Sequence, residues 1–395
     1  MHSLDIEKLR KDTPGCTQVL HFNNAGASLS PLAVISSIKE HLDLEAAMGG
    51  YEAAQFNLEK SEKLYHNAAG LINCLPDEIA FVENATRAWE MAFYSFKFKK
   101  GDRIVTAISE YASNYLAFLH KAKQLGVEII VISNDEYGQL DLDDLNRKLN
   151  EKVKLIALTH VPTQGGLINP IIEAGIIAKK HNIPYLVDTT QSLGQMPIDV
   201  HEIGCDFLCA TGRKYLRGPR GTGFLFARKA IIQNYEPPFI DLHSAQWISN
   251  NEYKLRNDAR RFETWEQNIA AKIGLATAID YALATGVDVT WQRIQGLAHQ
   301  LRENLKTIKG VNLQDLGKNK CGIVSFNCQK VEPNFIQEKL KKHKINVSIS
   351  LQEYARLDLE KRNINSLVRA SIHYYNTEKE IEKFCETLEF ILHQK

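Results

Sequence analysis

The sequence predicts an α/β protein whose larger part is a mostly parallel sheet enclosed by helices. Between about residues 60 and 240, short apolar runs rich in β-branched residues alternate with longer segments in which apolar residues recur at helical spacing. The short runs are almost continuously apolar, which is typical of parallel strands that helices cover on both faces. After residue 265 long helical stretches dominate, with a few short strands between them, and they indicate a smaller α+β domain.

Six runs are predicted to form strands of the sheet. They are RIVTAI (103–108), EIIVIS (128–133), KLIALTHV (154–161), PYLVDTT (184–190), DFLCAT (206–211) and GFLFAR (223–228). Helices are expected over 90–98, 114–126, 141–152 and 170–182, and several of these segments end at Gly or Asn, as helices commonly do.

The C-terminal third is expected to hold three helices and a few strands. The helices are predicted from about Asn268 to Ala284, from about Val289 to Ile308 and from Glu378 onward, and the strands within 310–316, 321–328 and 345–350. We therefore expect three parts of the chain: an N-terminal segment (1–25) that packs on the small domain, a large domain (26–265) and the small C-terminal domain (266–395).

Composition excludes several classes of protein. The chain has 395 residues and a formal net charge of +1, so no general field favours nucleic acid or a membrane surface. No apolar run approaches the roughly 20 residues of a membrane span, and the N-terminus lacks the apolar core of a secretory signal. The seven cysteines are irregularly spaced, so we expect reduced thiols, no metal site and a cytoplasmic location.

Polar groups gather where the predicted strands end. Asp188 closes one apolar run, and Lys214 follows another in the loop ATGRKYLRGPRGTG (210–223). A buried carboxylate is costly without a partner, although Asp188 could simply cap a helix, and Lys214 could be a solvated charge. Asn84, Ala85 and Thr86 precede an amphipathic run and form a natural phosphate site at a helix start, although ordinary capping residues look the same.

Pyridoxal 5′-phosphate is the one ligand that would use these groups together. It needs a lysine amine for its aldehyde, a carboxylate beside its pyridine nitrogen and a cup for its phosphate. An Asp followed by a Lys, each at a strand end, meets the first two needs.

Two stretches carry a family resemblance. VDTTQSLGQMPIDV (187–200) and DFLCATGRKYLRGPRGTGFLFARK (206–229) resemble the core of the class V aminotransferases, which are pyridoxal-phosphate enzymes of fold type I. Further matches follow in order at HFNNAGASLSP (21–31), SEYASN (109–114), THVPTQGG (159–166), RFETWEQN (261–268) and VRASIHYYNTEKEIEKF (368–384). The resemblance implies a large cofactor domain with a seven-stranded sheet, a smaller C-terminal domain and a homodimer with shared active sites.

The resemblance also implies a role for each matching residue. Lys214 would carry the cofactor as an aldimine, and Asp188 would pair with the ring nitrogen. The other cofactor-binding residues would be Ala85, Thr86, Tyr111, Thr163, Gln191, Thr211 and Arg213. On the substrate side the residues would be Asn24, Ala25, Gly26 and Arg369, the last of which would hold the substrate carboxylate bidentately.

Departures from the family pattern shape the expected reaction. Desulfurases of the family carry a cysteine on the loop before the carboxylate-binding arginine, and residues 347–369 contain none. They also usually have His before the lysine, where this chain has Arg213. RFETWEQN and the lysine loop most resemble the branch with hercynylcysteine sulfoxide lyases and isopenicillin-N epimerases.

The leading expectation is therefore a carbon–sulfur β-lyase. It would act on an S-substituted cysteine by α-proton abstraction at the Lys214 aldimine and would release pyruvate. An aminotransferase or an amino-acid epimerase is the alternative. A persulfide-forming cysteine desulfurase and a pyridoxal-phosphate-binding protein without activity are less favoured.

Overall fold

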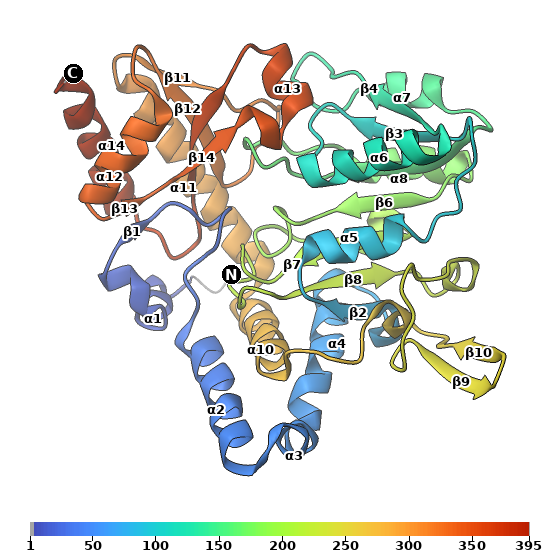
Figure 1. Cartoon of the computed structure of the whole chain (residues 1–395). Helices are drawn as coiled ribbons and strands as arrows, with labels where there is room; N and C mark the ends of the chain where they lie inside the picture. Colours follow the sequence, from blue (N-terminus) through green and yellow to red (C-terminus); the bar gives the residue numbers. More distant parts are fainter. Residues whose placement is uncertain (1–3, 395) are drawn as a thin grey trace.

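A seven-stranded sheet forms the centre of the protein (Figure 1). The computed structural model describes residues 4–394. Along the sheet the strands lie in the order β2 (Ile79–Val82), β8 (Gly223–Ala227), β7 (Phe207–Thr211), β6 (Tyr185–Asp188), β5 (Val153–Thr159), β3 (Arg103–Ala107) and β4 (Glu128–Ile132). Neighbours pair in parallel except at β8, which is antiparallel to both β2 and β7. The predicted fold class is confirmed, although the short β2 was not predicted.

Helices cover both faces of this sheet. The clusters of buried side chains place α5 (Ala85–Phe93) and α6 (Ala112–Leu125) on one face. They place on the other face α4 (Leu58–Ile72), α7 (Leu142–Lys148), α8 (Ile171–Lys180) and α10 (Ile269–Thr285). Successive strand residues point to opposite faces, so Leu186 joins the first cluster and Val187 the second. Both faces are buried, which explains the nearly continuous apolar runs.

Capping residues determine where the helices near the strand ends begin and stop. α5 begins after Asn84, whose Oδ1 accepts a hydrogen bond from the backbone N of Arg87 at 2.8 Å. α6 ends at Gly126, whose φ of 70° suits a glycine. The helix predicted over 90–98 instead spans Ala85–Phe93, because the apolar residues that follow, among them Phe96, pack into the core without helical structure.

A second, four-stranded antiparallel sheet lies in the C-terminal part. Its order is β11 (Val311–Leu313), β12 (Ile323–Cys328), β15 (Ser366–Ser371) and β14 (Ser348–Leu351). Around it pack α11 (Val287–Thr307), α12 (Pro333–Lys342) and α14 (Glu378–His393). β15, which carries Arg369, was not predicted as a strand.

The N-terminal segment runs along this second sheet. It holds α1 (Ile6–Lys11) and β1 (Leu20–His21), and β1 pairs in parallel with β13 (Ile345–Asn346). Asn23 bridges to Ser371 at the end of β15. The boundaries predicted for the three parts of the chain stay a prediction.

Two further units stand away from the main sheet. α2 (Leu32–Met48) and α3 (Gly50–Phe56) form the lower end of the view in Figure 1, and the hairpin of β9 (Ala245–Ser249) and β10 (Glu252–Leu255) projects at the lower right. The remaining short helices are α9 (Val200–Ile203), α13 (Arg356–Lys361) and the 3-10 turns Pro14–Thr17, Pro76–Glu78, Ile232–Asn234, Ala259–Phe262 and Gln352–Tyr354. Within residues 4–394, none of the helices has the length and apolar character needed to cross a bilayer.

Candidate active site

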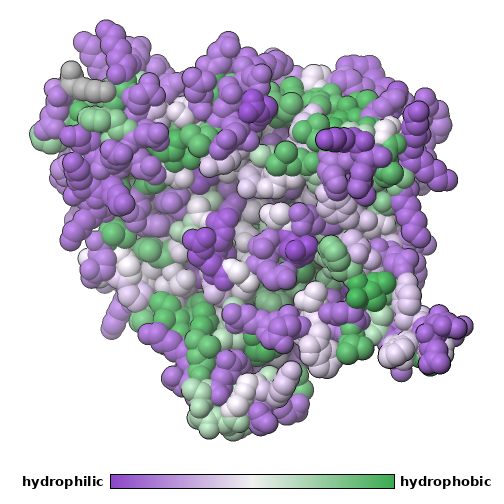
Figure 2. Space-filling model, viewed as in Figure 1, coloured by the Kyte–Doolittle hydropathy of each residue, from purple (hydrophilic) through white to green (hydrophobic). Residues whose placement is uncertain are grey.

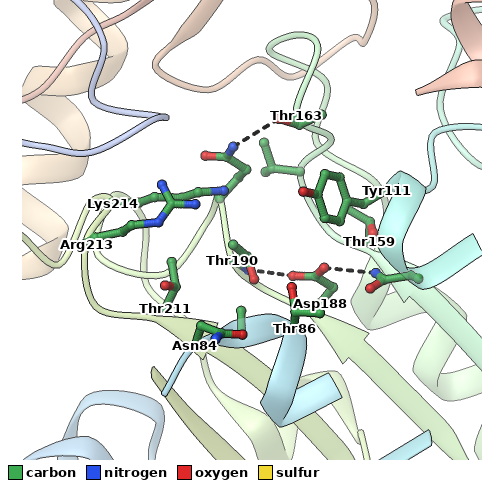
Figure 3. Close-up of a pocket in the computed structure, with 14 residues that line it drawn as sticks. Asn84, Thr86, Tyr111, Thr159, Thr163, Asp188, Thr190, Thr211, Arg213 and Lys214 are labelled. Atoms are coloured by element: carbon green, nitrogen blue, oxygen red, sulfur yellow. Dashed lines mark hydrogen bonds between the residues drawn. The ribbon is translucent and has the colours of Figure 1, made fainter. Parts of the chain in front are cut away.

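A pocket opens at the carboxyl ends of the parallel strands, where ligands bind in sheets of this kind (Figure 3). Fourteen residues line it: Asn84, Ala85, Thr86, Tyr111, Asn114, Thr159, Val161, Thr163, Asp188, Thr190, Gln191, Thr211, Arg213 and Lys214. All nine residues predicted to contact a cofactor are among them. They come from segments far apart in sequence that the sheet brings to one edge.

Lys214 enters this pocket from the loop after β7. The side chain is buried, with 8% of the residue exposed. Burial lowers the pKa of its amine well below the usual value, and the nearby guanidinium groups of Arg213 and Arg369 lower it further. The lowered pKa favours the unprotonated amine, which is the form that acts as a nucleophile or a base.

Asp188 closes β6, next to the strand that leads to Lys214. Its Oδ2 accepts a hydrogen bond from Asn114 Nδ2 at 3.0 Å, and its Oδ1 accepts one from the backbone N of Thr190 at 2.8 Å. These bonds favour one orientation of the carboxylate, and Asp188 faces the same cavity as Lys214 (Figure 3). The carboxylate can be buried here because each of its oxygens accepts a hydrogen bond, which offsets the cost of removing it from water.

The opposite end of the pocket is built to receive an anion. Ala85 and Thr86, the first two residues of α5, line this part of the cavity, and the first N–H groups of a helix have no partner within the helix. Thr211 and Arg213 line the same space. Gly223 lies so close to this helix start that a Cβ would approach the backbone N of Ala85 to 3.1 Å. The glycine therefore lets β8 pass directly beneath the helix start.

Arg369 lies beside the pocket and reaches it through Thr163. Its Nη1 donates to the backbone O of Thr163 at 2.8 Å and to Thr163 Oγ1 at 2.9 Å. Its Nε is buried without a hydrogen-bond partner among the described residues. Burial lowers the pKa of Arg369 to about 10, and no carboxylate of the described chain pairs with it. An unpaired, buried guanidinium is a receptor for a carboxylate.

The predicted substrate segment, Asn24 to Gly26, meets the pocket through its backbone. The O of Ala25 accepts from Gln191 Nε2 at 3.2 Å, and the O of Gly26 accepts from Arg213 Nη1. The Asn24 side chain is fully buried and bonds to the O of His21 and of Ser371 and to the Tyr375 hydroxyl, so the structure does not bring it to the cavity. Its predicted contact with substrate has no support in this geometry.

Sequence reasoning missed four residues of the lining, which are Asn114, Thr159, Val161 and Thr190; Asn84 had been named only as part of the helix start. Two of them had a detectable signal. Asn114 follows Glu110 by four residues, which puts both on one side of the start of α6, and Thr190 directly follows a strand-end carboxylate. Thr159 and Val161 flank the end of β5 and become visible only when the strand order is known.

Arg217 is the second unusual cation of the lysine loop. It is buried (2% exposed), has a φ of 61°, and packs against the rings of Tyr281, Tyr374 and Tyr375. Its guanidinium donates to the O of Leu29, to Tyr374 and to Thr13, while its backbone N donates to the O of Lys214 at 2.9 Å. Arg217 therefore braces the lysine loop against the N-terminal segment, whereas Arg220 is exposed.

The residues present fit pyridoxal 5′-phosphate. A buried amine of lowered pKa, a hydrogen-bonded carboxylate and the start of a helix share one cavity. Gln191 Oε1 and Thr190 Oγ1 are also buried there without partners in the described chain, so a ligand with polar substituents would satisfy them. The described residues contain no cluster of three or more metal-binding side chains.

Comparisons with known proteins agree with this geometry. The family model described as Aminotransferase class-V matches residues 20–384. A probable cysteine desulfurase of Pyrococcus abyssi is 34% identical over 97% of this chain and 96% of that protein. The apo structure of a cysteine desulfurase from Thermococcus onnurineus superposes with a TM-score of 0.93 at 31% identity, covering all of both chains. A C-DES mutant with glycine covalently linked to its PLP cofactor superposes at 0.86 over 96% and 98% of the chains, and its 21% identity shows the fold alone.

These findings confirm the predicted family and correct the predicted reaction. The expectation of a hercynylcysteine sulfoxide lyase-like β-lyase is wrong, because relatives that match nearly the whole chain at 30% identity or more are named cysteine desulfurases. Three sequence features had weighed against a desulfurase: the cysteine-free stretch 347–369, Arg213 in place of His, and the RFETWEQN motif.

Proposed function

Because the chain belongs to the class V aminotransferase family, we propose that it is a cysteine desulfurase, which removes sulfur from free L-cysteine and leaves alanine. Its cofactor is pyridoxal 5′-phosphate. The observation that carries the proposal is that a buried Lys214 of lowered pKa and a hydrogen-bonded Asp188 share one pocket, in a chain whose relatives are named for this reaction.

Each wall of the pocket would hold one part of the cofactor. Lys214 Nζ would bind the aldehyde carbon, and Asp188 would accept a hydrogen bond from the ring nitrogen. The helix start at Ala85 and Thr86, together with Thr211 and Arg213, would hold the phosphate. Tyr111 lies across the cavity from Lys214 in Figure 3 and would cover a face of the ring, while Gln191 and Thr163 would meet its hydroxyl side.

Lys214 would also move the protons of the reaction. When bound, the cofactor supplies an aldehyde that condenses with amines and a ring that withdraws electrons from the substrate α-carbon. Burial lowers the pKa of Lys214 Nζ, which favours the unprotonated form that would remove the α-proton and return protons later. Asp188 would keep the ring nitrogen protonated, which strengthens that electron withdrawal.

The substrate carboxylate would bind Arg369. Nη1 of this buried arginine is occupied by Thr163, so the two donors would be Nε, which has no partner among the described residues, and the adjacent Nη2. A bidentate pair would orient the amino acid so that its α-proton faces Lys214.

The sulfur acceptor would be a thiol from outside this chain. Of its seven cysteines, five are buried, Cys16 and Cys74 are half-buried, and none lines the pocket. Attack of an acceptor thiolate on the substrate sulfur forms an S–S bond while the Cβ–S bond breaks. The electron pair left on Cβ takes up a proton, so cysteine and a thiol give alanine and a persulfide, and the step is redox-neutral.

The protein would form a homodimer. Large apolar side chains are exposed along α2 and α3, and Figure 2 shows apolar surface over these helices at the lower end of the molecule: Leu42, Met48, Tyr51 and Phe56 are each more than two-fifths exposed. An apolar patch of this kind marks an interface. The hairpin β9–β10 carries a second exposed apolar site, where Trp247 is 70% exposed. A cytoplasmic location stays a prediction of the sequence.

The test is a product assay on the cofactor-loaded protein. With L-cysteine and dithiothreitol we expect equimolar alanine and sulfide, no pyruvate and no net conversion of the cofactor to its amine form. Pyruvate and ammonia as the main products would rule out desulfuration. Stable conversion of the cofactor to its amine form would indicate an aminotransferase instead.

A further inference from the structure

Behind Asp188 lies a second buried carboxylate, Glu110, which the proposed roles above do not use. Glu110 lies in the turn between β3 and α6 and is 4% exposed. Its Oε1 accepts hydrogen bonds from the backbone N of Tyr111 at 2.8 Å, from Asn114 Nδ2 at 2.8 Å and from Thr159 Oγ1 at 2.5 Å. Its Oε2 accepts one from Thr106 Oγ1 at 2.9 Å.

Asn114 connects the two carboxylates directly. Its Nδ2 donates one hydrogen to Glu110 Oε1 at 2.8 Å and the other to Asp188 Oδ2 at 3.0 Å. An amide nitrogen has two hydrogens, so both are used in this bridge. Any change in the charge or position of Glu110 is therefore passed to Asp188 through one side chain.

Glu110 itself lacks a compensating cation among the described residues. The groups that face Glu110 are the hydroxyls of Thr106 on β3 and Thr159 on β5, the amide of Asn114 on α6, the carboxylate of Asp188 on β6 and, farther off, the thiol of Cys209 on β7. Within residues 4–394, Glu110 has no ion pair with Lys, Arg or His. Two buried carboxylates joined by a neutral amide repel each other, so one of them tends to take up a proton.

We propose that Glu110 is a positioning residue that acts through Asn114 on Asp188 and couples the binding of the cofactor's protonated ring to its own ionisation. A protonated ring nitrogen at Asp188 brings the missing positive charge, which allows Glu110 to ionise. An ionised Glu110 in turn strengthens the hold of Asp188 on that ring proton. Burial, followed by the charge of Asp188, raises the pKa of Glu110 to about 7, so the coupling falls in the neutral range.

The inference rests on the cofactor of the proposed function and not on its amino-acid substrate. The test therefore measures cofactor binding alone. The apoprotein is titrated with pyridoxal 5′-phosphate from pH 6 to pH 8.5, and the affinity and the absorption spectrum are recorded for the wild type, Glu110→Gln and the exposed control Glu382→Gln. A desulfurase assay that fails leaves this measurement unaffected.

The expected result is a difference in pH profile. Gln cannot ionise, so the Glu110→Gln variant should bind the cofactor about as tightly as wild type at pH 6 and about tenfold more weakly at pH 8, as one pKa unit of lost coupling predicts. Glu382→Gln should follow wild type throughout. A purely structural role would lower the affinity of Glu110→Gln by the same factor at every pH, and parallel profiles would overturn the proposal.

Asn114→Ala tests the same coupling between Glu110 and Asp188 with a second variant. It leaves Glu110 in place but removes the bridge, so it should flatten the pH profile as Glu110→Gln does, and the double variant should add no further change. If Glu110→Gln does not fold, the pH profile of Asn114→Ala alone tests the proposal. A wild-type pH profile in Asn114→Ala would show that the coupling does not run through this amide and would contradict the proposal.

Discussion

Asp188 closes β6 and Lys214 follows the end of the neighbouring parallel strand β7, so that both side chains line one pocket. The two are held in opposite ways. Each oxygen of Asp188 accepts a hydrogen bond, whereas no hydrogen bond or ion pair to another described residue holds Lys214 Nζ. A carboxylate held by hydrogen bonds beside an amine of lowered pKa suits a cofactor that is hydrogen-bonded at its ring nitrogen and bonded covalently at its aldehyde carbon.

Replacing Lys214 by Ala should remove the covalent link to the cofactor. We expect the variant to lose the absorption band of the lysine-linked cofactor, and borohydride should no longer fix the cofactor to the protein. Absorbance spectroscopy and intact-protein mass spectrometry measure both effects. Lys379→Ala, on the exposed side of α14, is the matched control and should behave as wild type. If the band survives in Lys214→Ala, the assignment of this lysine is wrong.

Arg369→Lys should weaken recognition of the substrate carboxylate. Lysine cannot form a bidentate pair, and losing one charged hydrogen bond costs about 1.5–3 kcal/mol, or roughly 10- to 100-fold in kcat/KM for L-cysteine. The comparison substrate is cysteamine, which lacks the carboxylate and should be turned over at the same slow rate by both proteins. Arg356→Lys, in the exposed start of α13, controls for a general effect of the substitution. An equal loss for both substrates would place Arg369 in the framework and not at the carboxylate.

The sequence predicted the strands and the cofactor residues around the pocket because their signals are local. Buried parallel strands give continuous apolar runs, and the residues after Asp188 and around Lys214 lie within short motifs. The whole set of Ala85, Thr86, Tyr111 and the other predicted cofactor residues therefore lies in the lining. Whether each contacts the cofactor as expected stays a prediction.

The contacts that sequence could not reveal join distant segments. Asn114 and Asp188 are 74 residues apart and meet only because β3, β5 and β6 are neighbours in the sheet. Arg369 lies on a strand of the second sheet, and its bond to Thr163 spans 206 residues. Asn24 looked like a substrate residue because of its motif, but its side chain ties the N-terminal segment to the end of β15. The reaction type was mispredicted because a missing loop cysteine was weighed above overall similarity.

Replacing Lys214 by Met should stabilise the apoprotein at neutral pH. Burial lowers the pKa of Lys214 below that of the unfolded chain, about 10.5. Between these two pKa values the unfolded chain binds a proton that the folded chain does not, so the wild-type free energy of unfolding rises with pH across this window. Met does not titrate. The variant should therefore exceed the wild type in free energy of unfolding most at pH values below the folded-state pKa of Lys214, and the difference should fade as the pH rises toward 10.5. Thermal melts of the apoproteins at several pH values measure it. A difference in melting temperature that does not change with pH would contradict the lowered pKa.

Charged substitutions on α3 should dissociate the proposed dimer. Tyr51 and Phe56 are 77% and 68% exposed, so a Glu at either position has no folding cost within one chain, whereas it would bury a charge in an interface. Light scattering should give about twice 44.7 kDa for the wild type and 44.7 kDa for Tyr51→Glu/Phe56→Glu. Tyr137→Glu, which is 45% exposed in the loop after β4, should leave the mass of the wild type unchanged. A wild type of 44.7 kDa would contradict the dimer.

Activity should depend on an added thiol and on none of the chain's own cysteines. The two half-buried thiols, Cys16 and Cys74, lie outside the pocket, and burial raises the pKa of both, so neither is a ready nucleophile. We expect Cys16→Ser/Cys74→Ser to release alanine at the wild-type rate, and both proteins to require dithiothreitol or another small thiol as the sulfur acceptor in every turnover, the first included. After cysteine without added thiol, intact mass should show no added sulfur atom on the wild type. A stable persulfide on any cysteine of the chain, or loss of activity in the double variant, would instead place the acceptor within this protein, and a conformational change would then have to bring that thiol to the substrate sulfur.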